Sequence, residues 1–592
     1  MQRIRLLLIT LYIILIFSFN SFSQVIPVDR QTDWNNPGSD GMFLPSQSIN
    51  LLTIGADSTG TIPSDAALQQ AIIMLNGPGE IYIPGGQYLF EQTVNLPDSI
   101  ILQGEVDTVT NKLQTKLILA PGNNHGIIIS GSETNSGVTI TYPLMQGEQK
   151  IYVDQSQLFN SGDFIKLKAF DDSSLVNDFW AYHSTGQIFE ILQIINDSLF
   201  LNKPLRRSYT GNPPQIIKLN PARQVHLKCL IIERDDISTS QTSNIFFQSA
   251  VDCSVSGLES YLCNFAHINI YNSSKVTVEN SYFKDGHSYG SGGKAYGVMI
   301  EYNTGDCYIH QNNFEHLRHS IIFQSGANGN VVAYNYSKDP YWTGTILPAN
   351  SAGDLVFHGN YPYMNLLEGN VIQNIVIDNS HGKNGPNNLF FRNRAELYGI
   401  FMNNSPASDQ QTFIGNQVTN TSSSLYGMYL LQGVNHFEYG NQIKGNVLPA
   451  GTGEPIDSTL FQYTFNSFYQ SISSVPPIRN NNWLSTTPHI TAEYQKDNLL
   501  LNSTCEEIIY TGTSMSELIF YNNIKIYPNP FKENIFLNIS ENLNYKIINT
   551  SGIIVSEGKF KNGAINTEHL KPGLYFLILE GKEILEFKIV KF

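Results

Sequence analysis

An asparagine recurs through the middle of this chain at a nearly constant interval. Each copy lies two or three residues after an apolar, strand-like residue, at Asn280, Asn312, Asn335, Asn370, Asn393, Asn416 and Asn441. The spacing marks a repeat of about 23 residues with two enlarged turns, filled with short β-rich runs instead of apolar residues spaced for a helix. Such a period predicts a solenoid in which every rung adds one turn to a continuous core.

The composition fits a large exported globular protein. The chain has 592 residues, of which 41% are hydrophobic and only 14% are charged, so it can bury a sizeable core. Its formal net charge of −15 disfavours nucleic acid as a partner, because phosphate binding needs a basic surface. An acidic polysaccharide would need a local cluster of Lys, Arg or a bound cation to overcome the global repulsion.

The first 23 residues have the pattern of a signal peptide. Arg3 and Arg5 precede an apolar run from Leu6 to Phe19, and small residues follow, with cleavage expected after Ser23. The apolar run is shorter than the ~20 residues that a membrane span needs. We therefore expect export, with no membrane span in the mature protein.

Five cysteines are an odd number for an exported chain and do not indicate a disulfide framework. Cys253 and Cys307 each open an expected rung strand, so we interpret them as buried stacking thiols. No Cys or His spacing suggests zinc. The residues therefore predict no metal site and require no cofactor, although a Ca²⁺ ion bridging substrate and protein stays open.

The N-terminal region reads as the capped start of the solenoid. Ser64 and Asp65 begin an amphipathic helix that ends at Gly77, and short strands follow between Gly and Pro turns. The order IGADSTGT, ALQQAI, GEIYIPGGQYLF and LPDSIILQGE resembles the entry of the pectate lyase superfamily of right-handed parallel β-helices. That resemblance implies the fold, but the superfamily includes lyases, hydrolases, epimerases and tailspikes.

The sequence divides the rest of the chain into further parts. Residues 24–142 form the cap and first rungs, 143–222 a small antiparallel β insertion, 223–505 the main β-helix with an irregular end, and 506–519 a linker. Residues 520–592 contain IKIYPNPF, YKIINTSG and LKPGLYFLIL, which resemble the β-sandwich sorting domain of the type IX secretion system of Bacteroidota. The resemblance implies passage through that machinery, with the protein then secreted or attached to the cell surface. The alternative for this segment is a binding module of the same shape.

Rung stacking brings distant residues together on the surface. Lys294 and Arg318 lie one rung apart, about 4.8 Å along the axis, and resemble the Lys and Arg of the chondroitinase B and alginate lyase family. β-Elimination on a polyuronate needs a neutralised C6 carboxylate, a base for the C5 proton and an acid for the leaving O4. We therefore assign catalytic roles to Lys294, Arg318 and His319; the alternative is a solvated pair of cations.

The remaining candidate residues would bind substrate. They lie in the two enlarged turns and beside the rung strands: His287, Tyr296, Glu301, Tyr341, Trp342, Arg394, Glu396 and Tyr398. The function predicted is that of a secreted β-helix acting on an extended uronic-acid polysaccharide by elimination. One alternative is a glycoside hydrolase using paired carboxylates, for which Asp285, Glu301, Asp306, Asp378 and Glu396 are available. Among the histidines, His287, His316, His319 and His381 are candidates for an acid or base near neutral pH, with a satisfied surface or core histidine as the alternative. The other alternative is a non-catalytic carbohydrate-binding or adhesin β-helix.

Overall fold

The computed structural model describes residues 25–75, 77–107, 109–344, 352–422, 425–453, 460–461 and 505 of the region before the tail. In the tail it describes residues 526–527, 531–537, 544–549, 554–560, 564–580 and 584–591. The expected signal peptide at 1–23 and the expected linker at 506–519 lie outside these residues. The described residues fall into two compact units, one within 1–147, 163–189 and 205–506 and the other within 148–162, 190–204 and 507–592.

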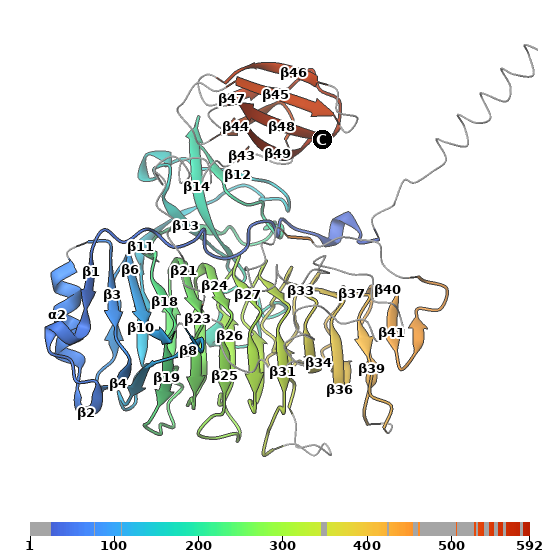
Figure 1. The fold of residues 1–592 in the computed structure, drawn as a ribbon. Coiled ribbons are helices and arrows are strands. Elements are labelled where there is room, and N and C mark those ends of the chain that lie inside the picture. Colours follow the sequence, from blue (N-terminus) through green and yellow to red (C-terminus); the bar gives the residue numbers. More distant parts are fainter. Residues whose placement is uncertain are drawn as a thin grey trace, which may run out of the picture. The chain divides into compact units, whose positions relative to one another are not determined.

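The chain between Ser48 and Leu448 coils into a right-handed parallel β-helix, whose strands stack side by side away from helix α2 (Figure 1). Three parallel sheets form its walls. Sheet 1 contains β1 (Ser48–Asn50), β3 (Gly79–Ile83), β6 (Ile100–Gly104), β18 (His226–Lys228), β21 (Ala250–Ser256), β24 (Ser274–Glu279), β27 (Tyr308–His310), β30 (Val331–Ala333), β33 (Leu366–Glu368), β35 (Leu389–Phe391), β37 (Thr412–Ile414) and β40 (Phe437–Tyr439), with β17 (Ala222–Arg223) pairing beside β21.

Sheets 2 and 3 are joined because β34 (Val371–Ile377) and β36 (Arg394–Met402) run through both. The other strands of sheet 2 are β2 (Thr59–Pro63), β4 (Gly86–Phe90), β9 (Thr115–Leu119), β19 (Ile231–Arg234), β22 (Glu259–Tyr261), β25 (Tyr282–Lys284), β28 (Asn313–Glu315), β31 (Tyr336–Lys338), β38 (Gln417–Val418) and β41 (Asn441–Ile443), which ends in a hairpin with β42 (Asn446–Leu448). The other strands of sheet 3 are β5 (Val94–Asn95), β10 (Ile127–Ser130), β20 (Ile245–Gln248), β23 (Ala266–Tyr271), β26 (Tyr296–Glu301), β29 (His319–Phe323), β32 (Leu355–Phe357) and β39 (Met428–Leu430).

Helix α2 (Asp65–Leu75) closes the first end of the stack (Figure 1). Its buried side chains include Leu68, Ala71 and Leu75, which join the same core as the rung residues. Covering the first rung in this way protects the sheet edges from pairing with another chain. The core then continues along the axis as stacked apolar side chains such as Phe283 on Phe314.

The recurring asparagines form a buried ladder. From Asn312 to Asn441, each side-chain Nδ2 donates to the Oδ1 of the asparagine one rung later. Asn280 does not belong to this ladder, contrary to the sequence analysis. It has a φ of 50° and precedes the ladder position, which Ser281 fills by donating its backbone N–H to Asn312 Oδ1.

The insertion is an antiparallel sheet in the order β11 (Ser132–Thr139), β16 (Gln215–Asn220), β13 (Phe164–Lys168), β14 (Gln187–Ile195), β15 (Ser198–Leu201) and β12 (Lys150–Tyr152). A 3₁₀ turn, η4 (Phe179–Ala181), lies between β13 and β14. The remaining short elements are η1 (Val28–Arg30), η2 (Leu51–Ile54), η3 (Ser156–Leu158) and the hairpin of β7 (Val106–Asp107) and β8 (Lys112–Leu113).

The tail forms two small antiparallel sheets. One contains β43 (Ile526–Tyr527), β44 (Asn534–Leu537) and β47 (Ala564–Asn566); the other contains β46 (Ile554–Lys559), β45 (Asn544–Asn549), β48 (Gly573–Glu580) and β49 (Ile584–Lys591). Apolar side chains such as Ile535 and Leu577 form their common core. The predicted fold class, with its cap, insertion and C-terminal sandwich, is confirmed.

The cysteines divide into one pair and three thiols. Cys229 and Cys505 form a disulfide, which the sequence did not indicate. Cys253, Cys263 and Cys307 are buried free thiols. None of the helices among the described residues is both long enough and apolar enough to cross a membrane.

Candidate functional site

A row of polar residues runs along the outer face of sheet 3, at the points where its strands end. The register pairs Ile300 with Phe323, Phe323 with Phe357, and Phe357 with Ile377. The residue after each of these belongs to what we call the exit row, and its members are Glu301, Gln324, His358 and Asp378. Since parallel rungs are about 4.8 Å apart, these four side chains are successive neighbours on one stripe.

His358 and Asp378 form a hydrogen-bonded pair in the exit row. Nδ1 of His358 lies 2.7 Å from Oδ2 of Asp378, and both side chains are largely buried but retain some exposure. Burial opposes the charge of Asp378, but the attraction and hydrogen bond of His358 outweigh it and lower the pKa of the carboxyl group. An aspartate bonded to Nδ1 fixes the ring orientation and leaves Nε2 to exchange a proton with a ligand.

A second such pair lies beside the first. His381 Nδ1 is 2.7 Å from Oδ2 of Asp178, and the rings of His358 and His381 are 4.9 Å apart. Asp178 belongs to the insertion, so the insertion completes a site that the rungs begin. Asn360 fixes it there, because its Oδ1 accepts from the backbone N–H of Asp178 and its Nδ2 donates to that residue's carboxylate.

Glu301 is the most perturbed carboxyl group of the exit row. Burial raises its pKa to about 7, although a hydrogen bond from Asn269 Nδ2 at 3.0 Å acts in the opposite direction. Its side chain is still partly accessible to solvent. A carboxyl group that is half-protonated near neutral pH and open to a ligand is suited to act as a general acid.

Tyr296, Arg318 and His319 lie at the other end of the same strands. The Tyr296 ring is 4.9 Å from His319, and the Arg318 guanidinium lies over it at 5.8 Å. Burial, reinforced by the nearby charges of Arg318 and His358, lowers the pKa of His319 to about 3. His319 Nε2 is buried and has no hydrogen-bond partner among the described residues. Burial also raises the pKa of Tyr296. The positive charge of Arg318 opposes this rise, whereas the negative charges of Asp378 and Glu301 add to it. Tyr296 therefore senses the charges at both ends of these strands.

The structure therefore brings together four of the residues that the sequence selected: Tyr296, Glu301, Arg318 and His319. Lys294 lies in the Gly-rich loop, where its Nζ is 3.5 Å from Ser288 Oγ, and the backbone N–H of Arg318 bonds to its neighbour Ala295. Arg318 donates to the carbonyls of Gly290 and Gly292 in the same loop. The catalytic assignments of Lys294, Arg318 and His319 stay predictions.

The other selected residues lie around or away from this group. Trp342 packs against the Arg318 guanidinium at 5.2 Å, and Tyr341 stacks on His316 at 4.8 Å. His287 Nε2 bonds to the carbonyl of Arg234. Arg394, Glu396 and Tyr398 lie on the part of β36 that begins in sheet 2: Arg394 Nε donates to Gln417, Glu396 is partly exposed and Tyr398 is fully buried.

Four further residues complete the site: Asp178, His358, Asp378 and His381. Asp378 and His381 were among the carboxylates and histidines that the sequence offered for acid–base chemistry, whereas Asp178 and His358 were not. His358 and Asp378 each directly follow an apolar run that ends in a core residue, and this position was the available signal. Asp178 carries no such signal, because its position depends on how the insertion folds back onto the rungs.

The described residues contain no group of three or more His, Cys, Asp or Glu side chains arranged to hold a metal ion. The Ca²⁺ bridge stays a prediction, because a substrate carboxylate would itself supply ligands.

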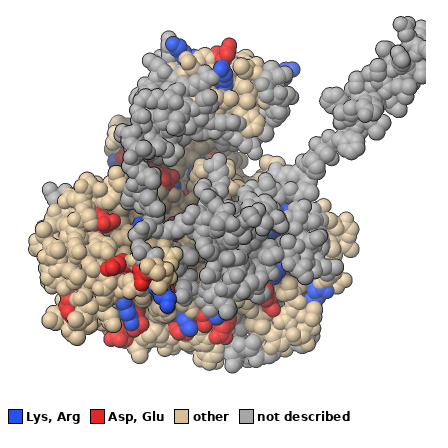
Figure 2. All heavy atoms as spheres, viewed as in Figure 1, with Lys and Arg blue, Asp and Glu red and all other residues tan. Residues whose placement is uncertain are grey.

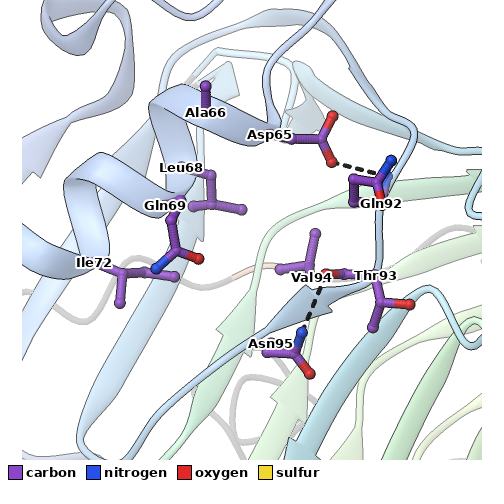
Figure 3. A pocket seen from close by; sticks show the side chains of 9 residues that line it. All are labelled: Asp65, Ala66, Leu68, Gln69, Ile72, Gln92, Thr93, Val94 and Asn95. Carbon is purple, nitrogen blue, oxygen red and sulfur yellow. Dashed lines mark hydrogen bonds between the residues drawn. The ribbon is translucent and has the colours of Figure 1, made fainter.

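A separate pocket lies between α2 and β5 and has fewer ionisable side chains than the exit row and its neighbours (Figure 3). Asp65 is the one charged residue in its lining, and its carboxylate already accepts the backbone N–H groups of Glu91 and Gln92 at 3.1 and 2.9 Å. These bonds fix the loop beneath the cap, so we assign this pocket a structural role.

Two segments match known protein families. Residues 48–186 match the rhamnogalacturonase A/epimerase, pectate lyase-like family, and residues 525–591 match the secretion system C-terminal sorting domain. Both resemblances inferred from the sequence are thereby confirmed. Together with the fold, they describe an exported β-helix protein with a pectate lyase-like segment at residues 48–186 and a C-terminal sorting domain. The sorting domain directs it across the outer membrane, to be secreted or attached to the cell surface.

Several solved structures resemble this fold. The tailspike protein gp49 of Pseudomonas phage LKA1 is 14% identical with a TM-score of 0.41, covering 67% of this chain and 83% of its own. An exopolygalacturonase from Thermotoga maritima is 11% identical with a TM-score of 0.33, and the match covers 69% of this chain and 95% of that protein. The mannuronan C-5 epimerase AlgE4 A-module of Azotobacter vinelandii is 12% identical with a TM-score of 0.30, and the match covers 67% of this chain and 87% of that module. No curated protein sequence matches the chain. Similarity this low supports no statement about activity.

Proposed function

We propose that the protein binds an extended uronic-acid polysaccharide along the exit row and cleaves it by β-elimination. The observation that carries the proposal is the His358–Asp378 pair on the same stripe as Glu301, the partly exposed carboxyl group whose pKa is raised to about 7. One group is oriented to accept a proton, and the other holds one near neutral pH. A reaction that removes one proton and supplies another needs such a pair.

The residues have distinct roles in this reaction. His358 Nε2 takes the proton from C5 of the uronate, and the C–H electrons form the C4–C5 double bond as the bond from C4 to the glycosidic oxygen breaks. Glu301 gives its proton to that oxygen. Asp378 is a positioning residue that holds His358 and stabilises the imidazolium formed. His381 in its cationic form would donate to the C6 carboxylate of the substrate and favour loss of the C5 proton.

Hydrogen-bond donors at the site can bind an acidic ligand in spite of the net charge of −15, because the carboxylates of Asp378 and Asp178 are each already bonded to a histidine. His358, His381 and Arg318 lie at the site, whereas on the face shown in Figure 2 acidic and basic residues are interspersed along the edge of the β-helix. A local group of cationic or ionisable donors can attract a polyanion that the whole molecule repels.

Along the axis, the proposed base His358 lies nearer to Glu301 than Asp378 does. Glu301 and Asp378 are three rungs apart, so their backbones are separated by about 14 Å at about 4.8 Å per rung. Glu301 and His358 are only two rungs apart, and the His358 ring extends from the same face.

The test is to incubate the purified protein with polygalacturonate, alginate and hyaluronate and to follow ultraviolet absorbance together with reducing ends. Elimination predicts that both signals rise in parallel on one of these polymers. New reducing ends without the absorbance would instead show hydrolysis. Retention on a polymer with neither signal would show a binding protein or adhesin.

A further inference from the structure

The insertion carries a pair of exposed aromatic side chains that have no role in the proposed reaction. Phe179 is 85% exposed and Trp180 is 50% exposed, both in η4. The described residues contain only two other comparably exposed aromatic side chains, Tyr152 and Phe170, and both are less exposed than Trp180. Large aromatic groups left in solvent at adjacent positions commonly mark a binding surface.

The backbone that presents these rings is held rigidly against the rungs. Asn360 Oδ1 accepts the backbone N–H groups of Asn177 and Asp178 at 2.9 and 3.2 Å, just before η4. Just after it, Tyr302 donates its hydroxyl hydrogen to the carbonyl of Tyr182 at 2.8 Å. The short turn is therefore fixed at both ends, and a ligand stacking on its rings would not have to order a loose loop.

The turn lies next to the exit row. The Trp180 ring meets the His381 ring edge-on at 5.5 Å, and His381 in turn lies 4.9 Å from His358. The turn therefore borders the site: Trp180 lies beside His381, and Tyr182 just after the turn is bonded to Tyr302, the residue that follows Glu301. A polymer lying along the exit row would pass beside this turn.

We propose that Phe179 and Trp180 form a sugar-stacking subsite that binds a pyranose ring of the polysaccharide next to His381. This inference rests on the proposed function for the identity of the polymer. An aromatic face matches the apolar C–H face of a pyranose, and the exposed indole N–H can donate to a ring hydroxyl. Binding energy from this remote ring would then position the neighbouring sugar over His358.

The experiment measures polymer affinity without relying on cleavage. The full chain carrying His358→Ala is titrated with polygalacturonate, alginate and hyaluronate by affinity electrophoresis, alone and combined with Trp180→Ala, Phe179→Ala or the matched control Tyr152→Ala. We expect Trp180→Ala to weaken retention about tenfold, Phe179→Ala to weaken it less, and Tyr152→Ala to leave it unchanged. Trp180→Phe should restore most of the affinity, and thermal unfolding should be the same for all variants.

The outcomes separate this inference from the proposed reaction. If a polymer is retained and Trp180→Ala and Phe179→Ala bind it as tightly as the parent, the subsite is refuted and the reaction is untouched. If Trp180→Ala weakens retention of a polymer that the wild-type protein does not cleave, the subsite stands and elimination fails. If none of the three polymers is retained by the parent, the subsite for an acidic polysaccharide is refuted together with the proposed function.

Discussion

At the scale of single residues, the site depends on two ionisable groups that their surroundings drive in opposite directions. Asp378 is kept ionised by His358, whereas burial favours the protonated form of Glu301. Pairs of groups with pKa values pushed apart are typical of acid–base chemistry. Elsewhere in the fold, His316 and Asp339 make a similar pair at 2.6 Å, but on a more exposed surface.

Replacing His358 by Ala is expected to lower kcat at least 100-fold, because the other histidine oriented by an aspartate, His381, is assigned to the C6 carboxylate and not to the C5 proton. Asp378→Asn should also lower kcat, because the amide cannot stabilise the imidazolium. The measurement is the rate of unsaturated product formation at saturating polymer. His316→Gln is the matched control and should retain wild-type activity; equal activity in His358→Ala would remove the base assignment.

The pKa of about 7 at Glu301 predicts how activity depends on pH. As pH rises through 7, Glu301 loses the proton that the leaving oxygen needs, so kcat/KM should fall on the alkaline side. Glu301→Gln should be slower and should lack this alkaline limb in a profile from pH 5 to 9. An unchanged alkaline limb in the variant would show that another group provides the proton.

The same shift has a consequence for stability. The pKa of Glu301 is higher in the folded protein than its ordinary value of about 4.3. The folded state therefore binds this proton more tightly, and the resulting contribution to the free energy of unfolding is fully present below about pH 4.3 and is lost as the pH rises through about 7. As the pH rises from 4.5 to 7, the melting temperature of the wild type should therefore fall relative to that of Glu301→Gln. A difference that does not vary across this range would contradict the raised pKa.

At the scale of elements, the asparagine ladder stabilises the turns that lead into sheet 2. Asn370 shows the pattern: its Nδ2 donates to Val332 O and Asn393 Oδ1, and its Oδ1 accepts from the backbone and side chain of Asn335. Each member thus satisfies buried groups of two neighbouring rungs. A second ladder of the same kind runs through Asn330, Asn365 and Asn388.

Asn370→Ala should lower the free energy of unfolding by about 1–3 kcal/mol, because it leaves buried donors and acceptors unpaired. Chemical denaturation of the β-helix body measures this. Asn403→Ala is the control, since Asn403 is exposed and its side chain donates to Asn379 Oδ1, which is itself an exposed contact. Similar destabilisation by both variants would contradict a special role for the ladder.

These elements also show what the sequence could and could not predict. The repeat was predictable because the asparagines recur at a nearly constant interval, although Asn280 precedes the ladder position by one residue. The hydrogen bonds that link these side chains into a ladder were not predicted. Glu301, Arg318 and His319 were predictable because rung stacking follows from the repeat. Asp178 and Trp180 were not, because their proximity to His381 depends on how a non-repeating insertion folds.

At the scale of the whole molecule, the exported body and the sorting domain carry separate tasks. The β-helix and its insertion hold every group of the candidate site, whereas residues 525–591 match a sorting domain. Removing residues 520–592 should therefore block passage across the outer membrane while the purified body keeps its polymer binding. Cell fractionation and affinity electrophoresis check the two halves of this prediction, and normal secretion of the shortened chain would contradict it.

The most direct test of the account compares product formation by the wild type, His358→Ala and His316→Gln on the same uronate polymer. The account predicts unsaturated products from the wild type and from His316→Gln, and none above background from His358→Ala. Unsaturated products at equal rates from all three proteins would contradict the placement of the active site on the outer face of sheet 3.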